Sequence, residues 1–279
     1  MPTFDTPEPI TATIELPIGE LRIVATDRPD TVVEVRAEPA DQAVADAVRV
    51  ELVGTELRVT GRKLGLRLLQ IPTPGRSVEV EVALPAGSAL TARTTYGGIR
   101  VEGRLGDVDV RCSYGDVRVE DTGSLKAAAA YGQVHADGIV AGDADVTSDH
   151  GGIRLRHVTG SADLRSKHGA IRADVVAGEL RLANSHGDVE VDDAAAGVDA
   201  RTSFGAIRLA RVHRGEVSVT STHGRIDVAV DPDSAVWLEV DTKGRVRNDL
   251  TPREGPEGFG EAVTLRARSR EGDIVVRRA

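Results

Sequence analysis

The stretch that decides the fold is His168-Gly169-Ala170-Ile171-Arg172-Ala173, which returns in altered form as His186-Gly187-Asp188-Val189-Glu190-Val191. A ring residue followed by glycine occurs eight times, at steps of 17 to 19 residues. Each copy has Ile or Val three positions after the ring and Val, Leu or Ala five positions after it. A fixed period of this kind predicts one supersecondary unit stacked on copies of itself. The other copies begin at Tyr96, Tyr114, Tyr131, His150, Phe204 and His223.

Each repeat is long enough for two short strands joined by glycine turns. Successive coils would stack at about 4.8 Å through parallel pairing, so that every inward position becomes a ladder. The fold class predicted is therefore all-β: a single-chain parallel β-solenoid or β-helix of ~18-residue coils with a strand-rich N-terminal cap. A flattened two-sheet coil and a three-sided coil both fit, and the handedness is left open. A small, mostly polar ladder lies two positions before the ring, at Cys112, Ala129, Ser148, Ser166, Asn184, Thr202 and Ser221.

The chain divides into three segments by its repeat pattern. Residues 1–90 are expected to form a strand-rich segment continuous with the solenoid, 91–232 the repeat solenoid of about eight coils, and 233–279 irregular C-terminal coils and a cap. Trp237 lies where the period becomes irregular, and we expect it to plug the last coil.

Residues 1–90 carry several local signals. Alternating runs flank Pro17-Ile18-Gly19-Glu20 and again Gly54-Thr55-Glu56, and both patterns predict a β-hairpin. Asp41–Ala47 is expected to be a short helix with Asp41 as its N-cap. Lys63–Arg76 mixes leucines with prolines and is expected to be an excursion loop, and Asn248–Glu261 near the other end is also expected to be a loop.

Composition excludes several function classes. The formal net charge is −9 and the pI is near 5.3, which argues against a nucleic-acid binder. The lone Cys112 excludes an intramolecular disulfide, and its slot among small residues favours packing over a nucleophilic role. There is no apolar run of membrane-spanning length and no signal-like N-terminus. We therefore expect a cytoplasmic protein that reaches an envelope only through a partner.

These residues resemble a known family. The alternating N-terminal strands, Leu84-Pro85-Ala86-Gly87, the recurring glycine phrase and the terminal Gly272-Asp273-Ile274-Val275-Val276 look like a bacterial putative-adhesin family of unknown function. The resemblance covers nearly the whole chain. It implies a β-solenoid of short coils and envelope association, and it implies no catalytic residues.

Three histidines fill the ring slot in successive coils and are candidate metal ligands. His150, His168 and His186 would stack at strand spacing, where imidazoles could share a metal or respond to pH. The alternative is a structural slot for a flat ring at a corner. Since Tyr and Phe fill the same slot elsewhere, the structural alternative is favoured, and the sequence predicts no cofactor.

A row of arginines is the candidate partner-binding surface. The position after the first inward residue is arginine in five repeats, and the residue two positions later is often acidic, as in Glu102 and Glu120. Residues two apart on a strand share a face, so an arginine stripe would run beside an acidic stripe. This is either a mutually neutralised solvent face or a docking face for an anionic polymer or charged partner. The five arginines are Arg100, Arg118, Arg154, Arg172 and Arg208.

The sequence therefore predicts a non-catalytic scaffold or adhesin-like interaction module that presents charged and polar ladders to a protein partner or a cell-envelope polymer. The alternative is a carbohydrate-active β-helix enzyme acting on an anionic polymer, for which Asp149, His150 and Lys167-His168 are the best local cluster. A solenoid with an unpaired end would be a monomer or an end-to-end dimer.

Overall fold

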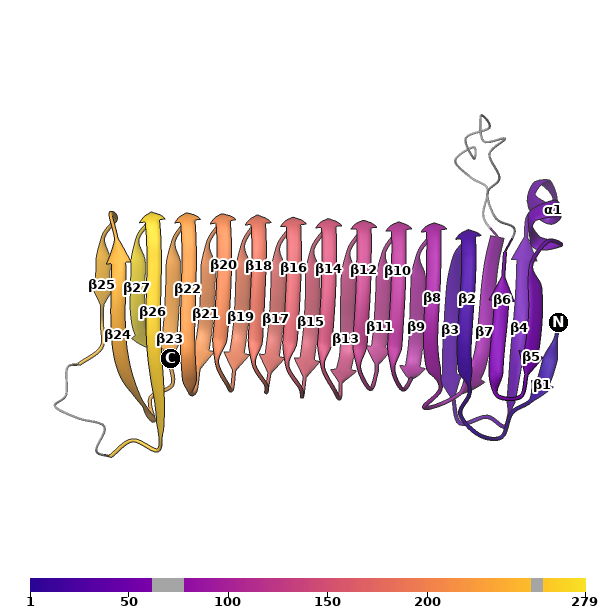
Figure 1. Cartoon of the computed structure of the whole chain (residues 1–279), viewed down its shortest axis with the longest axis horizontal. Helices are drawn as coiled ribbons and strands as arrows, with labels where there is room; N and C mark the ends of the chain where they lie inside the picture. The colour runs from indigo at the N-terminus through magenta and orange to yellow at the C-terminus, as the bar shows by residue number, and fades with distance from the viewer. Residues whose placement is uncertain (62–77, 252–257) are drawn as a thin grey trace. The chain divides into compact units, whose positions relative to one another are not determined.

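The computed structural model describes residues 1–61, 78–251 and 258–279. The chain forms two compact units, Met1–Gly138 and Ile139–Ala279. The strands of each unit lie in two layers (Figure 1). The expected excursion loop Lys63–Arg76 and part of the expected loop Asn248–Glu261 lie outside the described residues.

The first unit has two sheets, both containing strands from the N-terminal segment and from the repeats. One sheet has the order β1 (Thr3–Asp5), β4 (Asp30–Ala37), β7 (Val78–Pro85), β3 (Glu20–Thr26), β9 (Ile99–Arg104), β11 (Val117–Asp121) and β13 (Val134–Val140, which ends just past the unit). The other has the order β5 (Arg49–Val53), β6 (Glu56–Thr60), β2 (Thr11–Ile18), β8 (Ala89–Tyr96), β10 (Val108–Tyr114) and β12 (Leu125–Tyr131).

The second unit repeats this plan. Its first sheet has the order β15 (Ile153–Val158), β17 (Ile171–Val176), β19 (Val189–Ala194), β21 (Ile207–Val212), β23 (Ile226–Val230), β27 (Ile274–Arg278) and β25 (Val246–Asn248). Its second sheet has the order β14 (Ala144–His150), β16 (Ala162–His168), β18 (Leu180–His186), β20 (Val198–Phe204), β22 (Gly215–His223), β26 (Glu261–Glu271) and β24 (Ser234–Thr242).

The core of each unit lies between its two sheets and consists of apolar ladders. In the second unit Ile153, Ile171 and Val189 are neighbours in one parallel register, and all three are buried. Val146 and Leu164 form a matching ladder in the facing sheet. The chain is thus a parallel β-solenoid, as the sequence predicts. The described strands form two sheets per unit, which identifies the flattened coil.

The ring-glycine phrase forms the corner where the chain passes from one sheet to the other. Gly169 stands at such a corner with φ +151°, and its N–H donates to the carbonyl of His186 in the next coil at 3.0 Å. The small residue two positions before the ring bonds to the corner of the preceding coil, because Ser166 Oγ donates to the carbonyl of Gly151 at 3.3 Å. Asn184 of the same ladder donates to the corner carbonyls of both Gly169 in the preceding coil and Gly187 in its own coil, so residues of this buried ladder bond to corner carbonyls.

The hairpin expected at Pro17-Ile18-Gly19-Glu20 is wrong. β2 and β3 lie in different sheets, where β2 pairs in parallel with β8 and β3 pairs in parallel with β9. Ile18 lies beside Tyr96 in the register, and Gly19 has the corner φ of +134°. This turn is therefore a further corner of the ring-glycine type, with Ile18 in the ring position, and the solenoid begins well before Tyr96.

The remaining N-terminal signals are confirmed in part. β5 and β6 form the antiparallel hairpin expected around Gly54. The expected helix is shorter: a 3-10 turn, Pro39–Asp41, leads into α1 (Gln42–Ala45), with Asp41 at the N-cap position. β4 pairs antiparallel with β7, and β1 pairs antiparallel with β4. These antiparallel strands make the beginning of the first unit a strand-rich cap.

The last strands of the second unit are not in chain order. β26 inserts between β22 and β24, so that Glu271 lies beside His223 and the earlier strand β24 is outermost. Trp237 lies on the outer face of β24 with 76% of its surface exposed, whereas Val236 and Leu238 on either side of it are half-buried. The expectation that Trp237 plugs the last coil is therefore wrong. In the described ranges, no helix has the length and apolarity needed to cross a membrane.

Candidate functional site

The best candidate site lies on the outer face of β3, β9 and β11 in the first unit. Ile99 and Val117 are register neighbours that point into the core, so the residues that follow them point outward. Arg22, Arg100 and Arg118 therefore form one outward row across three adjacent strands. Two of the five predicted partner-binding arginines, Arg100 and Arg118, are direct neighbours in this row.

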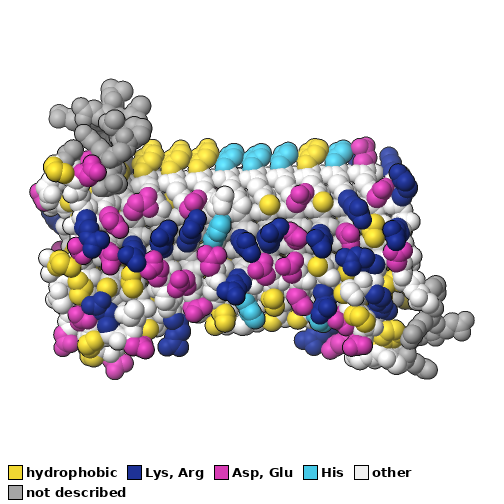
Figure 2. All heavy atoms as spheres, turned by 180° about the vertical axis from the view of Figure 1, so that it is seen from behind, with side chains coloured by type: hydrophobic (Ala, Val, Ile, Leu, Met, Phe, Trp, Pro, Cys, Tyr) yellow, Lys and Arg dark blue, Asp and Glu magenta, His cyan; other side chains and the backbone are white. Residues whose placement is uncertain are grey.

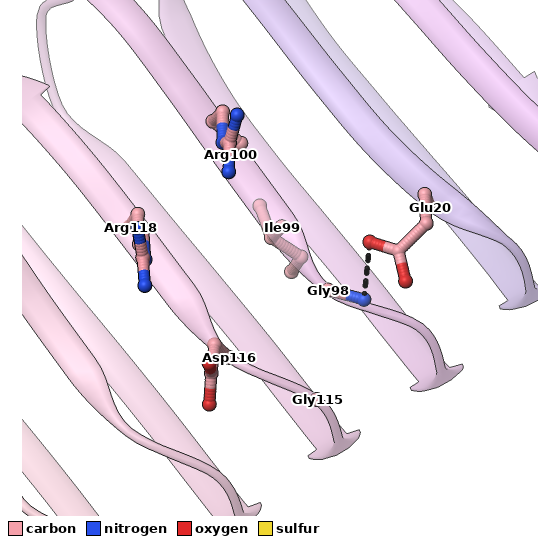
Figure 3. A pocket seen from close by; sticks show the side chains of 7 residues that line it. All are labelled: Glu20, Gly98, Ile99, Arg100, Gly115, Asp116 and Arg118. Carbon is pink, nitrogen blue, oxygen red and sulfur yellow. Dashed lines mark hydrogen bonds between the residues drawn. The ribbon is translucent and has the colours of Figure 1, made fainter.

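A second row lies two residues before the first, at or directly before the start of the same strands, and consists of Glu20, Gly98 and Asp116. Glu20 Oε2 accepts a hydrogen bond of 2.9 Å from the Gly98 N–H. Asp116 Oδ1 accepts one of 2.9 Å from the Gln133 N–H of the next coil. The second row, together with Arg100 and Arg118 of the first, lines a shallow hollow of about 220 Å³. Figure 3 shows Arg100 and Arg118 side by side, with the Glu20–Gly98 bond and Asp116 at the other end of the hollow.

The acidic side chains of this face neutralise Arg22. Arg22 Nη2 lies 2.9 Å from Glu102 Oε2, and its Nη1 lies 3.4 Å from Glu81 Oε2. The hydrogen bond that Arg22 donates to Glu102 raises the pKa of Arg22 and lowers the pKa of Glu102. Glu102 is thus bound to Arg22 and not to its own neighbour on β9, Arg100.

Arg100 and Arg118 remain without an ion pair. Glu120, the expected acidic neighbour of Arg118, instead accepts a hydrogen bond of 2.7 Å from the N–H of Gly103. Within residues 1–61, 78–251 and 258–279, no carboxylate lies within ion-pair distance of either guanidinium. Both arginines are exposed. The charge of Arg100 helps to lower the pKa of Glu102, but in the described part of the chain neither guanidinium contacts a carboxylate directly, so both keep their N–H donors for an anion from solution.

The other three predicted arginines lie in the second unit and are paired. Arg154 and Arg172 are register neighbours, and Glu190 occupies the next place, between Arg172 and Arg208. Arg172 and Arg208 both contact the Glu190 carboxylate, and Arg154 Nη2 lies 3.8 Å from Asp174 Oδ2. This part of the arginine row therefore matches the alternative of a mutually neutralised solvent face. The sequence carried the signal, since Glu190 holds the same place after Gly187 that Arg172 holds after Gly169.

The three candidate metal-binding histidines form a stack of nearly parallel rings in the second unit. The ring centroids of His150 and His168 lie 4.9 Å apart at an interplanar angle of 7°, and those of His168 and His186 lie 5.0 Å apart at 15°. The nitrogen lone pairs lie in the ring planes, so parallel rings direct them side by side and not toward a common point. Histidine side chains, cyan in Figure 2, follow one edge of the visible face.

The ring residues stack on one another at the corners of both units, whether they are tyrosines or histidines. In the first unit Tyr96 and Tyr114 stack at 5.0 Å, and Tyr114 and Tyr131 stack at 4.9 Å, with the same near-parallel geometry as the histidines. No group of three or more metal-ligating side chains occurs in the described part of the chain. This geometry supports the flat-ring interpretation, and a metal at His150, His168 and His186 stays an untested alternative.

The remaining candidates have structural contacts. Lys167 Nζ lies 2.7 Å from Asp149 Oδ1 in an exposed ion pair, which contributes little to stability. Cys112 is buried and its Sγ donates to the carbonyls of Gly97 at 3.2 Å and Gly115 at 3.3 Å. Burial raises the pKa of the Cys112 thiol, which opposes a nucleophilic role.

One polar cluster has no counterpart among the sequence predictions. His213 Nε2 lies 3.0 Å from Asp193 Oδ1, and His213 Nδ1 lies 3.5 Å from Asp231 Oδ2. The imidazole directly follows β21 and lies between one carboxylate from the preceding coil and one from the following coil. His213 lies outside the ring slot, and no local pattern marks it, because its two partners come from other repeats.

Comparison with known proteins finds one family model and several solved structures of low sequence identity. No curated protein matches the sequence. A putative adhesin from Bacteroides fragilis matches in structure with 12% identity and a TM-score of 0.42, covering 100% of this chain and 95% of its own. A putative adhesin from Parabacteroides merdae matches with 11% identity and a TM-score of 0.40, covering 99% and 94%.

A third structure, a putative lipid binding protein from Parabacteroides distasonis, matches with 14% identity and a TM-score of 0.36, covering 100% and 95%. At such scores the structural matches carry no argument about function. The family model described as Toastrack DUF4097 matches residues 13–177, which is more than half of the sequence. The chain therefore belongs to the Toastrack DUF4097 family.

Proposed function

We propose that this protein is a non-catalytic interaction module and that Arg100 and Arg118 bind an anionic group of its partner. The observation that carries the proposal is that, among the described residues, neither of these two exposed neighbours forms an ion pair with a carboxylate. Like charges at adjacent strand positions repel, and elsewhere on the outer face carboxylates offset that repulsion. An anion bound from solution would supply the missing counter-charge.

The partner we favour is an anionic envelope polymer. The formal net charge of −9 disfavours binding by overall charge, so attraction must come from a local cationic patch. A polymer that carries a carboxylate on each unit can bring one anion to the arginine pair and extend along the outer face. The cellular location remains a separate prediction, for which cell fractionation is the direct measurement.

The test is binding to alginate, a polyuronate, measured with the full chain at low and high salt. We expect salt-sensitive binding that the double variant Arg100→Gln/Arg118→Gln weakens at least tenfold. The matched control is Arg172→Gln/Arg208→Gln, which removes the same charge from guanidiniums that are already paired. Equal losses in the two double variants would overturn the assignment of the site.

The same experiment separates the enzyme alternative. Alginate incubated with the protein is examined for new chain ends by chromatography. Binding without shortened chains agrees with an interaction module. Shortened chains whose appearance requires intact Arg100 and Arg118 would show that the protein is a carbohydrate-active enzyme and would overturn the non-catalytic proposal.

A further inference from the structure

One coil of the first unit has histidine in the slot that holds arginine in the two coils before it. On β13, His135 lies beside Arg118 in the parallel register, and Arg118 lies beside Arg100. His135 points outward like the two arginines, because Val134 and Ala136 on either side of it are buried. His135 therefore extends the arginine pair by one coil, at the strand spacing of about 4.8 Å.

The His135 ring is held by a residue whose slot has another role in other coils. His135 Nε2 lies 2.8 Å from Gln133 Oε1. Elsewhere the slot of Gln133 holds an acidic residue whose carboxylate accepts a backbone N–H of the next coil, as Asp116 and Asp188 do. Gln133 Oε1 contacts the imidazole instead, so in this coil the slot orients a histidine.

The hydrogen bond with Gln133 decides which nitrogen of His135 is left for a ligand. An amide oxygen can only accept, so Nε2 carries the proton in this geometry. Among the described residues, His135 Nδ1 has no hydrogen-bond partner. In the neutral ring Nδ1 is an acceptor that disfavours an anion, whereas in the imidazolium it is a second N–H donor on a positive group. His135 can therefore bind an anion in its protonated form.

Within the first unit, the charges that face His135 come from β11 and from its own strand. Arg118 lies directly beside it, and Asp116 and Glu120 lie two residues before and after Arg118. Both of these carboxylates already accept a backbone N–H. Asp137 follows His135 by two residues on β13 and has an interaction of its own. In the described ranges, no carboxylate lies within ion-pair distance of the His135 imidazole.

We propose that His135 is a third anion-binding residue of this site and that its protonation strengthens binding of the polymer. Protonated His135, Arg118 and Arg100 form a row of three cationic donors on consecutive coils. An anion beside the imidazole stabilises its charged form, and the charged form attracts the anion by the same free energy. The inference rests on the proposed role of Arg100 and Arg118, and it adds a binding residue and a pH dependence.

The test measures alginate binding to the full chain at about pH 5.5 and about pH 8, at constant ionic strength. The carboxylates of the polymer stay ionised over this range, because ordinary carboxyl groups titrate near pH 4, and the arginines stay charged. We expect the wild-type protein to bind about fivefold or more tightly at the lower pH. Equal affinity at the two pH values would overturn the inference.

Two substitutions of one exposed position separate charge from shape. His135→Gln keeps a polar side chain without the charge, so its affinity at the lower pH should fall to the value at the higher pH. His135→Arg restores the residue of the neighbouring coils, so it should bind at both pH values about as tightly as the wild-type protein does at the lower pH. A variant His135→Arg that binds no better than the wild-type protein at the higher pH would contradict the proposed role.

The matched control is His223→Gln. His223 is half-buried like His135, but it lies in the ring slot of the second unit, 3.4 Å from Glu271 Oε2. Its loss should leave the pH dependence of alginate binding unchanged. A pH dependence that survives His135→Gln, or that His223→Gln abolishes, would assign the effect to another group and overturn the inference.

Failure of the inference differs from failure of the proposed function. If alginate binding requires Arg100 and Arg118 but does not change with pH, the inference fails and the proposed function stands. If alginate binds at neither pH, both fail. The imidazole proton resonance that His135→Gln removes should move when alginate is added at the lower pH. A resonance that stays in place while alginate binds would show that the polymer does not contact His135, which would also overturn the inference.

Discussion

Replacing Gly169 with alanine tests whether close stacking of corners explains the glycine in every ring-glycine phrase. The added Cβ would lie 2.2 Å from the carbonyl oxygen of Gly151 and 2.5 Å from its carbonyl carbon. These are backbone atoms of the neighbouring coil, which cannot rotate away. Residue 169 also has a φ of +151°, which L-residues rarely adopt. The backbone conformation costs about 1–2 kcal/mol and the steric overlap about 1–3 kcal/mol, so we expect a loss of about 2–5 kcal/mol.

Gly54→Ala is the matched control, because it separates the two causes. Gly54 has a φ of +59°, but a Cβ there would have no atom within 4 Å. We expect it to cost only about 1 kcal/mol, from the backbone conformation alone. Guanidinium denaturation followed by circular dichroism measures both variants, and transition slopes show whether unfolding remains cooperative. If Gly169→Ala is no more destabilising than Gly54→Ala, the stacking explanation is refuted.

Three further predictions test the coil register, the ring stack and the outermost strand. Ile171→Asp should unfold part of the second unit, because it places a charge in a buried ladder, whereas Arg172→Ala should cost less than about 1 kcal/mol; similar denaturation midpoints for the two would contradict the register. His168→Phe should leave the melting temperature nearly unchanged, and His168→Ala should lower it, because a stacked pair contributes about 0.5–1.5 kcal/mol; equal melting temperatures would argue against stacking as the role of the slot. Trp237, the only tryptophan, should show the red-shifted fluorescence of a solvated indole and full quenching by iodide; protection that increases with protein concentration would instead indicate an end-to-end dimer.

Much of the fold follows from the sequence, because the residues of each inward ladder recur along the chain at steps of 17 to 19 residues. The failures share one cause, which is that pairing partners are remote. Pro17–Glu20 has the local composition of a hairpin, yet β2 pairs with β8, which follows a long insertion. The sequence likewise contains no local sign that β26 inserts before β24. A corner between sheets and a hairpin within a sheet need the same turn residues, so local pattern cannot separate them.

The candidate site was only half predictable for the same reason. The arginine slot is visible in the repeat, and Arg100 and Arg118 are neighbours as expected. Their unpaired state depends on where Glu102 and Glu120 bind, and both bind residues of other coils. The acidic end of the hollow depends on Glu20, which belongs to a coil that the sequence pattern did not identify.

The arginine pair is best understood as a feature that the fold does not need. Two like charges on adjacent strands destabilise a sheet by up to about 1 kcal/mol. The second unit shows that the repeat can remove such a cost, because Glu190 takes the same slot and contacts both Arg172 and Arg208. An acidic residue at the position of Arg118 would do the same for Arg100 without disturbing the core, since this slot points outward. On β9 and β11 this slot holds arginine and not an acidic residue, which agrees with a role in binding. An anionic ligand group between the two guanidiniums would replace their repulsion by attraction.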